Sequence, residues 1–407
     1  MSDSPLSVDA ALASLLAAAA PISDHETCPA EAALGRVLAI PLVAEVTVPP
    51  LDNAAMDGYA LRFADWSDAT GVPAWLPISQ RIPAGTLGSE LVPGTAARIF
   101  TGAAVPPGVD CVVMQEDCEA YDGKVRLTAT PKAGSHIRRA GEDIRAGQTV
   151  LEAGTRLGPA QLGVAASVGA TELGVVRRLK AAVFFTGDEI VLPGQPLAPG
   201  RIYNSNRATL IALLTQMGIE VIDLGQVPDR LEATIATLER AAQAADVVIT
   251  SGGVSVGEED HVKAAVEQLG RLSMWKVAMK PGKPLVYGRV GNADFLGLPG
   301  NPVSAFVVFC LFVRPFLLRR MGAESQPAAA FTVPAGFDWP GIGKSAGKRR
   351  EFLRARLEDG WAMLYPNQGS GVLTSLAWAD GLVDIEAGAS VMNGDSVRFI
   401  PLSELLK

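Results

Sequence analysis

Residues 246–265, DVVITSGGVSVGEEDHVKAA, combine a glycine-rich turn with acids that directly follow it. The apolar run ends in Thr250, Ser251, Gly252 and Gly253, and a helix with three acids at its start comes next. Backbone amides left free at such a turn bind phosphate, although a strand-to-helix turn without any ligand explains the glycines equally well. Acids behind the turn would repel a phosphate unless a cation lay between them. The stretch therefore predicts a phosphate ligand together with a divalent cation.

Three carboxylates are candidate ligands for that cation: Glu189, Asp229 and Asp260. Mg²⁺ is a hard cation that proteins bind through a few carboxylates together with substrate phosphates. Asp260 could also cap its helix, whereas Glu258 and Glu259 are explained as favourable charges at a helix start. We therefore expect Mg²⁺ as the cofactor, held by Glu189, Asp229 and Asp260.

A stiff turn in residues 275–288, WKVAMKPGKPLVYG, carries three lysines: Lys276, Lys280 and Lys283. Two prolines and a glycine in this segment stiffen the turn. Most lysines are solvated, but a rigid turn just before a strand holds Lys280 and Lys283 in place. Lysines beside carboxylates in one pocket suit a ligand made of an anion and a metal.

The segment KRREFLR predicts the start of a strand with two adjacent arginines, Arg349 and Arg350. Adjacent strand residues face opposite sides, so we expect only one of the two to point into a given pocket. Arginine binds oxyanions through paired donors. Ser370 in NQGSG is a further candidate donor, although a plain turn is a simpler explanation of that segment.

These residues must be positioned by a sheet, because strands and helices alternate from about residue 180 to residue 322. Such alternation predicts right-handed crossovers and a parallel sheet covered on both faces. Ligands bind beyond the carboxyl ends of the strands of such a sheet, so we expect the four strand ends to share one rim. They are Thr186-Gly187-Asp188-Glu189, Pro228-Asp229, Thr250-Ser251-Gly252-Gly253 and Pro299-Gly300-Asn301-Pro302.

The texture of the chain predicts a multidomain α/β protein. Helical patterns flank a Gly- and Pro-rich segment of short apolar runs, and the helical signal disappears near the C-terminus. We expect residues 1–45 and 147–177 to form a discontinuous N-terminal domain, into which a β-rich domain of residues 46–146 is inserted. Residues 178–325 are the expected central α/β domain, and residues 326–407 a small β-barrel or sandwich.

Composition excludes several classes of function. The 407 residues carry a net charge of −8 with no basic cluster, which argues against nucleic acid as a partner. The four cysteines lack CxxC spacing and fit a reducing compartment. The apolar run in residues 303–320 contains Arg314 and Pro315, so a buried core helix is expected rather than a membrane span. We expect a cytoplasmic protein.

Eight motifs, in order along nearly the whole chain, resemble the MoeA family of molybdopterin molybdenumtransferases, to which the C-terminal domain of gephyrin also belongs. The motifs are NAAMDGYA, RIFTGA, HIRRAGEDI, FTGDEI, VPDR, TSGGVSVGEEDHVK, MKPGKP and LGLPGNPVSAF. The resemblance implies the last step of molybdenum cofactor synthesis, in which adenylylated molybdopterin and molybdate give the cofactor and AMP with a divalent cation. It also implies an elongated homodimer, in which the inserted domain of one subunit approaches the central domain of the other.

The resemblance implies roles for individual residues. The positions implied as catalytic are Asp57, Thr101, Asp143, Glu189, Asp229, Asp260, Lys276 and Lys280, the first three from the partner subunit. The positions implied for molybdate are Lys280, Lys283, Pro284, Ser304, Arg349 and Ser370. The substrate is expected on Thr250, Ser251, Gly252, Gly253, Pro299, Gly300, Asn301 and Pro302. His261 and Phe185 depart from the Tyr and Ser that are usual in the family.

Two other functions fit the same fold. A molybdopterin adenylyltransferase resembles the central domain but usually has a single domain, whereas this chain has long flanking regions. A scaffold protein without activity is the second alternative, and the retained acids and lysines weigh against it. The adenylyltransferase and the enzymes that accept the finished cofactor are possible partners of the chain.

Overall fold

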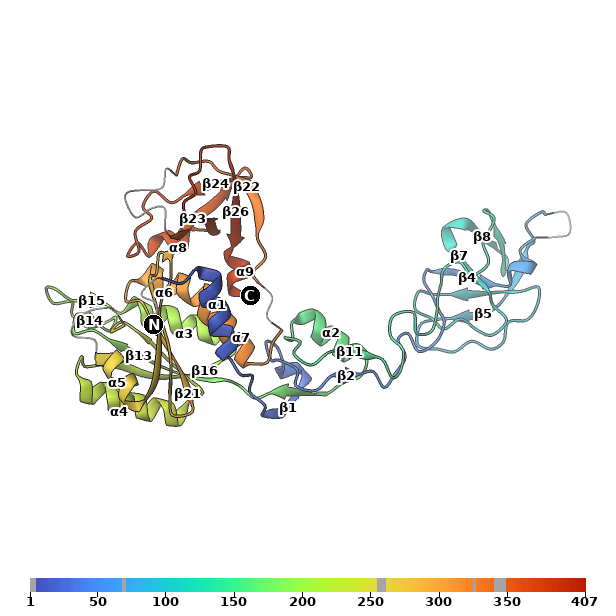
Figure 1. The fold of residues 1–407 in the computed structure, drawn as a ribbon. Coiled ribbons are helices and arrows are strands. Elements are labelled where there is room, and N and C mark those ends of the chain that lie inside the picture. The colour runs from blue at the N-terminus through green and yellow to red at the C-terminus, as the bar shows by residue number, and fades with distance from the viewer. Residues whose placement is uncertain (1–4, 68–70, 255–260, 325–326, 340–348) are drawn as a thin grey trace.

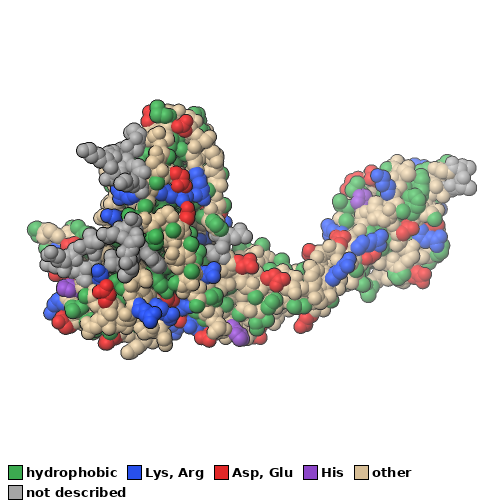
Figure 2. All heavy atoms as spheres, in the orientation of Figure 1, with side chains coloured by type: hydrophobic (Ala, Val, Ile, Leu, Met, Phe, Trp, Pro, Cys, Tyr) green, Lys and Arg blue, Asp and Glu red, His purple; other side chains and the backbone are tan. Residues whose placement is uncertain are grey.

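The computed structural model describes residues 5–67, 71–254, 261–324, 327–339 and 349–407. The molecule is elongated, with a central α/β domain and a C-terminal β domain side by side, and a narrow arm that carries the inserted domain at its far end (Figure 1). Acidic and basic side chains are interspersed along the visible face of the arm and the inserted domain (Figure 2).

The central domain is built on a six-stranded sheet of order β16-β13-β17-β21-β20-β18. The first four strands are parallel, as predicted, whereas β20 and β18 are antiparallel and were not predicted as a pair. The strands are β13 (Lys180–Thr186), β16 (Glu220–Val227), β17 (Val247–Ser251), β18 (Gly270–Lys276), β20 (Pro284–Val290) and β21 (Ala293–Leu298). A two-stranded ribbon, β14 (Ile190–Val191) and β15 (Ile202–Tyr203), follows β13.

Both faces of this sheet are buried, because side chains alternate along each strand. On β13, Val183 and Phe185 belong to one core, and Ala182 and Phe184 to the other. Helices α3 and the 302–320 helix cover the first face, and α4 and α5 cover the second. The helices are α3 (Ser205–Gln216), α4 (Leu231–Ala244) and α5 (His261–Leu269).

The most apolar helix is a core helix, as predicted. It runs through α6 (Pro302–Val308), a π-helical segment (Phe309–Val313) and α7 (Arg314–Arg320). Its length and composition would allow it to cross a membrane, but 78% of its most apolar window is buried inside the protein.

The N-terminal helix α1 (Val8–Ala18) packs on the central domain rather than with the arm. Its buried residues Val8, Ala11 and Leu15 join the core of α3 and α7, and Leu6 forms a bridge with Val277. The expectation that residues 1–45 form one unit with residues 147–177 is therefore wrong for this helix, because its apolar face is complementary to the sheet core.

The arm joins two segments that are distant in the sequence. Strand β1 (His25–Pro29) pairs with β12 (Glu172–Val176), and β2 (Leu42–Val43) pairs with β11 (Thr149–Leu151). Helix α2 (Pro159–Ser167) packs beside them, with Pro159 at its first turn as predicted. The short helix η1 (Ala30–Ala32) also lies here.

The inserted domain is a six-stranded sheet of order β7-β4-β6-β5-β9-β8, with one core on each face. Short strands separated by turns were predicted for it. The strands are β4 (Gly58–Leu61), β5 (Leu76–Ile82), β6 (Ala96–Ile99), β7 (Cys111–Met114), β8 (Cys118–Tyr121) and β9 (Lys124–Leu127). A ribbon of β3 (Asn53–Ala54) and β10 (Ile137–Arg138) and the short helices η2 (Phe63–Asp65) and η3 (Gln115–Asp117) complete it.

The C-terminal sheet incorporates one strand from the central domain. Its order is β19-β23-β25-β26-β22, and β24 pairs with β23. Strand β19 (Met279–Lys280) lies in the lysine-rich turn and runs parallel to β23 (Arg350–Glu358), with Lys280 opposite Glu351. The other elements are β22 (Phe331–Pro334), β24 (Trp361–Leu364), α8 (Thr374–Trp378), β25 (Gly381–Ile385), β26 (Ser396–Pro401) and α9 (Leu402–Leu406).

Candidate functional site

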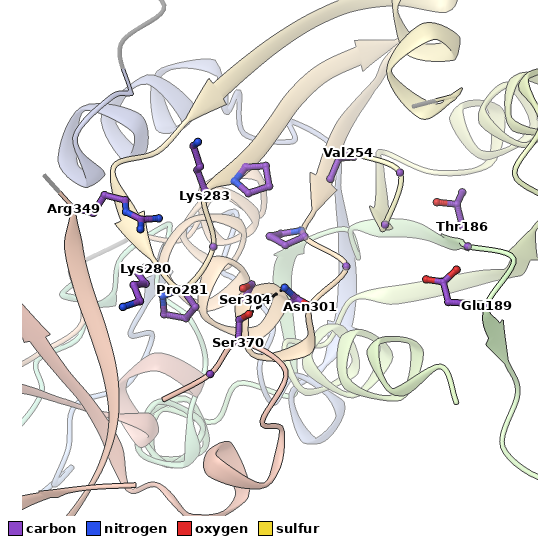
Figure 3. Close-up of a pocket in the computed structure, with 18 of the residues that line it drawn as sticks. Thr186, Glu189, Val254, Lys280, Pro281, Lys283, Asn301, Ser304, Arg349 and Ser370 are labelled. Carbon is purple, nitrogen blue, oxygen red and sulfur yellow. Dashed lines mark hydrogen bonds between the residues drawn. The ribbon is translucent and has the colours of Figure 1, made fainter. Parts of the chain in front are cut away.

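A cavity of about 620 Å³ lies where the carboxyl ends of the parallel strands meet the C-terminal domain. Its volume is in the range of small-molecule sites. Figure 3 shows Thr186 and Glu189 at one end, and Lys280, Lys283, Arg349 and Ser370 at the other. The lining residues are Thr186, Gly187, Glu189, Asp229, Gly252, Gly253, Val254, Lys280, Pro281, Gly282, Lys283, Pro284, Pro299, Gly300, Asn301, Ser304, Arg349, Gln368, Gly369 and Ser370.

The acidic end of the cavity is formed by Thr186, the last residue of β13, and by Gly187, Glu189 and Asp229 in the loops after β13 and β16. Gly187 has a φ of +137°, and a Cβ there would lie 2.6 Å from Glu189 Oε2, so the turn requires glycine. The Thr186 hydroxyl is buried and has no hydrogen-bond partner among the described residues. Two carboxylates and a hydroxyl therefore converge on one end of the cavity.

The glycine turn after β17 brings backbone to the cavity. Gly252 and Gly253 have φ values of +95° and +62°, and a Cβ on Gly252 would lie 2.7 Å from the Thr186 carbonyl oxygen. Thr250 and Ser251, predicted as substrate-binding, do not line the cavity. They are the last two residues of strand β17, and both are buried.

Ser251 instead supports the loop after β21. Its hydroxyl donates to the Pro299 carbonyl at 2.9 Å, and Asn206 Nδ2 donates to both Ser251 Oγ and the Gly300 carbonyl at 2.7 Å. Of the strand end predicted to bind substrate, Pro299, Gly300 and Asn301 line the cavity, and Pro302 does not. Pro302 is the first residue of α6, where its fixed φ starts the helix.

The basic end draws on both domains. Lys280, Lys283 and Pro284 come from the central turn, Ser304 from the first turn of α6, and Ser370 from the C-terminal domain. The Ser370 hydroxyl accepts from Asn301 Nδ2 at 3.1 Å, and its carbonyl accepts from the Val303 amide at 3.0 Å. Lys280 Nζ lies 3.5 Å from Glu351 Oε2, a buried carboxylate. The positive charge of Lys280 is therefore partly neutralised.

The two adjacent arginines differ in their surroundings: Arg349 directly precedes β23, and Arg350 is its first residue. Arg349 lines the cavity, whereas Arg350 donates to both carboxylate oxygens of Asp384 at 2.7 and 2.6 Å. These hydrogen bonds raise the pKa of the Arg350 guanidinium. Among the described residues, Arg349 has no ion-pair partner.

Of the predicted catalytic residues of the central domain, Glu189, Asp229 and Lys280 line the cavity and Lys276 does not. Lys276 ends the antiparallel strand β18, opposite Pro284, and precedes the turn that reaches the cavity. Asp260 lies outside the described residues. Within the described ranges, no group of three or more His, Cys, Asp or Glu side chains could hold a metal. The structure thus brings together Glu189 and Asp229 of the three predicted cation ligands.

The three residues implied for a partner subunit lie in and next to the inserted domain, far from the cavity of their own chain (Figure 1). The Thr101 amide and hydroxyl donate to Asp57 Oδ1 at 2.8 and 2.7 Å. These bonds, with a smaller contribution from Arg98, lower the pKa of the Asp57 carboxyl. Asp143 is exposed, and its amide donates to the Val48 carbonyl.

The sequence analysis missed Gln368 as a site residue, and it placed Thr186 on the rim without giving it a role. Thr186 is the last residue of a predicted strand, at the position where such sheets bind ligands. Gln368 and Gly369 directly precede Ser370 in a segment that was explained more simply as a turn. The position of Thr186 at a strand end, and that of Gln368 beside Ser370, could have indicated a place near the site. Only the tertiary arrangement shows which side chains reach the cavity.

Family models match three parts of the chain. Residues 6–169 match the MoeA N-terminal region (domain I and II), residues 182–319 a probable molybdopterin binding domain, and residues 335–402 the MoeA C-terminal region (domain IV). These matches span the arm with the inserted domain, the central domain and the C-terminal sheet, in that order.

Relatives and solved structures agree with these models. A molybdopterin molybdenumtransferase of Haemophilus influenzae is 45% identical over 72% of this chain and 72% of that protein. Molybdopterin molybdenumtransferase 2 of Mycobacterium tuberculosis is 42% identical over 88% of this chain and 90% of that protein. A crystal structure of a molybdopterin biosynthesis MoeA protein from Pyrococcus horikoshii has a TM-score of 0.76 at 32% identity, covering 98% of this chain and 99% of that chain.

Proposed function

The chain belongs to the MoeA family of molybdopterin molybdenumtransferases, and we propose that it takes molybdenum from molybdate into adenylylated molybdopterin and releases AMP. It is a transferase that inserts molybdenum into molybdopterin. The adenylylated form of the substrate, molybdate as the molybdenum source and AMP as the product are the further content of the proposal.

The observation that carries the proposal is that one cavity has an acidic end and a basic end (Figure 3). A substrate with a pyrophosphate and a separate oxoanion requires these two environments at once. The backbone of Gly252 and Gly253, beside the Thr186 hydroxyl, suits the pyrophosphate, because a side chain there would collide with Thr186. The basic end suits a tetrahedral dianion.

The acidic end fits Mg²⁺. Glu189 and Asp229 are hard oxygen donors, and the buried Thr186 hydroxyl has no protein partner among the described residues. Mg²⁺ commonly takes one or two carboxylates and completes its shell with water and phosphate oxygens. Glu189, Asp229 and, from the sequence, Asp260 would hold it, and when bound it would polarise the phosphate linkage for cleavage.

The protein's own groups orient the two substrates. Lys280, Lys283 and Arg349 supply fixed positive charge and N–H donors for molybdate. Ser370 adds a hydroxyl whose position is set by Asn301. Because these groups are anchored in two domains, they hold the oxoanion at a fixed place beside the bound substrate, which lowers the entropic cost of the transfer.

We also propose that the enzyme is a homodimer. The Asp57–Thr101 pair lies far from its own cavity, so it can contribute to a site only in a second copy (Figure 1). The arm exposes Leu34, Ile40, Val43 and Val46, each with 47% or more of its surface accessible. Several exposed apolar side chains in one part of the molecule favour contact with another protein surface. A cytoplasmic location stays a prediction.

The proposal is tested by incubating the full-length protein with adenylylated molybdopterin and Mg²⁺, with and without molybdate, and measuring AMP by chromatography. AMP release that depends on molybdate is the expected result. Formation of adenylylated molybdopterin from ATP and molybdopterin would instead identify an adenylyltransferase. Absence of both reactions would favour a scaffold role.

A further inference from the structure

A second arginine of β23, Arg354, lies fully buried behind the basic end of the cavity. Its Nη2 donates to the Gly369 carbonyl and its Nε to Ser375 Oγ, both at 3.0 Å. Its main chain exchanges two hydrogen bonds of 2.9 Å with the Gln368 side chain. Gln368 and Gly369 line the cavity, so the guanidinium is one residue behind the cavity wall.

The charge of Arg354 is not neutralised by an acid within the described ranges. None of the ion pairs of those residues includes Arg354, whereas Arg350, four residues earlier on the strand, is paired with Asp384. Burial alone lowers the pKa of Arg354, to about 10, so it remains charged at neutral pH. A buried charge without a counterion is costly to the folded protein.

We propose that Arg354 is a fixed positive charge that makes the basic end prefer a dianion to a monoanion of the same shape. The inference rests on the proposed function, in which this end binds an oxoanion. Arg354 does not touch the ligand: it acts through the low-dielectric wall formed by Gln368 and Gly369. A dianion in the cavity supplies the countercharge that none of the described acidic residues gives to Arg354.

A different role would be purely structural, since Arg354 also holds the loop of Gln368 and Gly369 in place. The two roles differ in how they treat ligand charge. A Coulomb energy is proportional to the charge of the ligand, whereas a displaced loop would weaken tetrahedral anions of either charge alike. Molybdate is a dianion and perrhenate a monoanion of the same geometry, so this pair separates the two roles.

The test is isothermal titration of the full-length protein with sodium molybdate and with sodium perrhenate. Arg354→Met and Arg354→Gln remove the charge, and Arg354→Lys retains it. For the neutral variants we expect binding weaker by about fivefold for perrhenate and by about 25-fold for molybdate, because the electrostatic free energy doubles with the ligand charge. Arg354→Lys should keep the wild-type ratio of the two affinities, even if both fall.

The matched control is Arg356→Met on the same strand. Arg356 donates to the Trp378 carbonyl and stacks on the Trp378 ring, and it does not line the cavity. It should change neither affinity by more than about twofold, because its charge is partly exposed and screened. Equal losses for both anions in the neutral Arg354 variants, or failure of both to fold in a thermal melt, would overturn the inference and leave a structural brace. A wild-type protein that binds neither anion would count against the proposed function instead.

Discussion

The acidic and basic ends of the cavity are built in different ways. The acidic end comes from the loops after β13, β16 and β17, which are neighbours in one sheet. The basic end needs a turn of the central domain, the start of α6 and two segments of the C-terminal domain. One end is thus a property of a single sheet edge, and the other exists only where two domains meet.

The two ends of the cavity therefore suit different kinds of ligand group. The sheet edge positions oxygen ligands and free amides, which suit a phosphate and its cation. The domain junction collects cations from several elements around an anion. Each end should therefore respond to its own substitutions, and a change at one end should leave the ligand of the other end bound.

The largest effect is expected from Glu189→Gln at the acidic end. Loss of a carboxylate ligand removes several kcal/mol of charge stabilisation, so AMP release should slow by about 100-fold. Molybdate affinity, measured by titration, should stay unchanged. Glu239→Gln, at an exposed position of α4, is the matched control. Loss of molybdate binding in Glu189→Gln would show that the two ends are not separable.

A smaller effect is expected from Thr186→Val. This change removes the buried hydroxyl at the acidic end but keeps the shape of the side chain, so we expect about a fivefold loss in kcat/KM for adenylylated molybdopterin, equivalent to one hydrogen bond. Thr250→Val removes a buried hydroxyl that also lacks a partner among the described residues but does not line the cavity. Equal losses in the two variants would mean that the hydroxyl acts through the fold rather than on the substrate.

The smallest effect, with the opposite sign, is expected from Glu351→Gln at the basic end. The buried Glu351 carboxylate lies 3.5 Å from Lys280 Nζ and repels a bound anion. Its neutralisation should tighten molybdate binding by about threefold, with no effect on substrate affinity. Weaker molybdate binding would instead mean that Glu351 holds Lys280 in its binding position.

The sequence predicts the acidic end better than the basic end. The alternation of strands and helices is a local pattern, and it is sufficient to place Glu189, Asp229 and the glycine turn on one rim. It did not separate Thr250 and Ser251 from Gly252 and Gly253, because one residue decides whether a strand end faces a core or the cavity. Only the three-dimensional structure shows that β17 ends at Ser251 and that the cavity lining begins at Gly252.

The basic end depends on contacts between distant segments. The pairing of β19 with β23 involves two residues of each strand, too few to give a periodic pattern in the sequence. The packing of α1 was also missed. The sequence analysis assigned this helix to the discontinuous N-terminal domain, because an amphipathic pattern does not identify the surface on which a helix packs. Strand alternation did predict that only one of Arg349 and Arg350 would reach the cavity, and Arg349 does.

Because β19 pairs with β23, oxoanion binding is thermodynamically coupled to docking of the central and C-terminal domains. Lys280 and Arg349 belong to different domains and line one cavity only while β19 is paired with the start of β23. By thermodynamic linkage, an anion that binds only the joined arrangement must oppose separation of the domains with the free energy of its own binding. The bound anion would then stabilise the docked arrangement of the two domains as well as take part in the reaction. Hydrogen exchange along β19 should therefore slow when the anion is present.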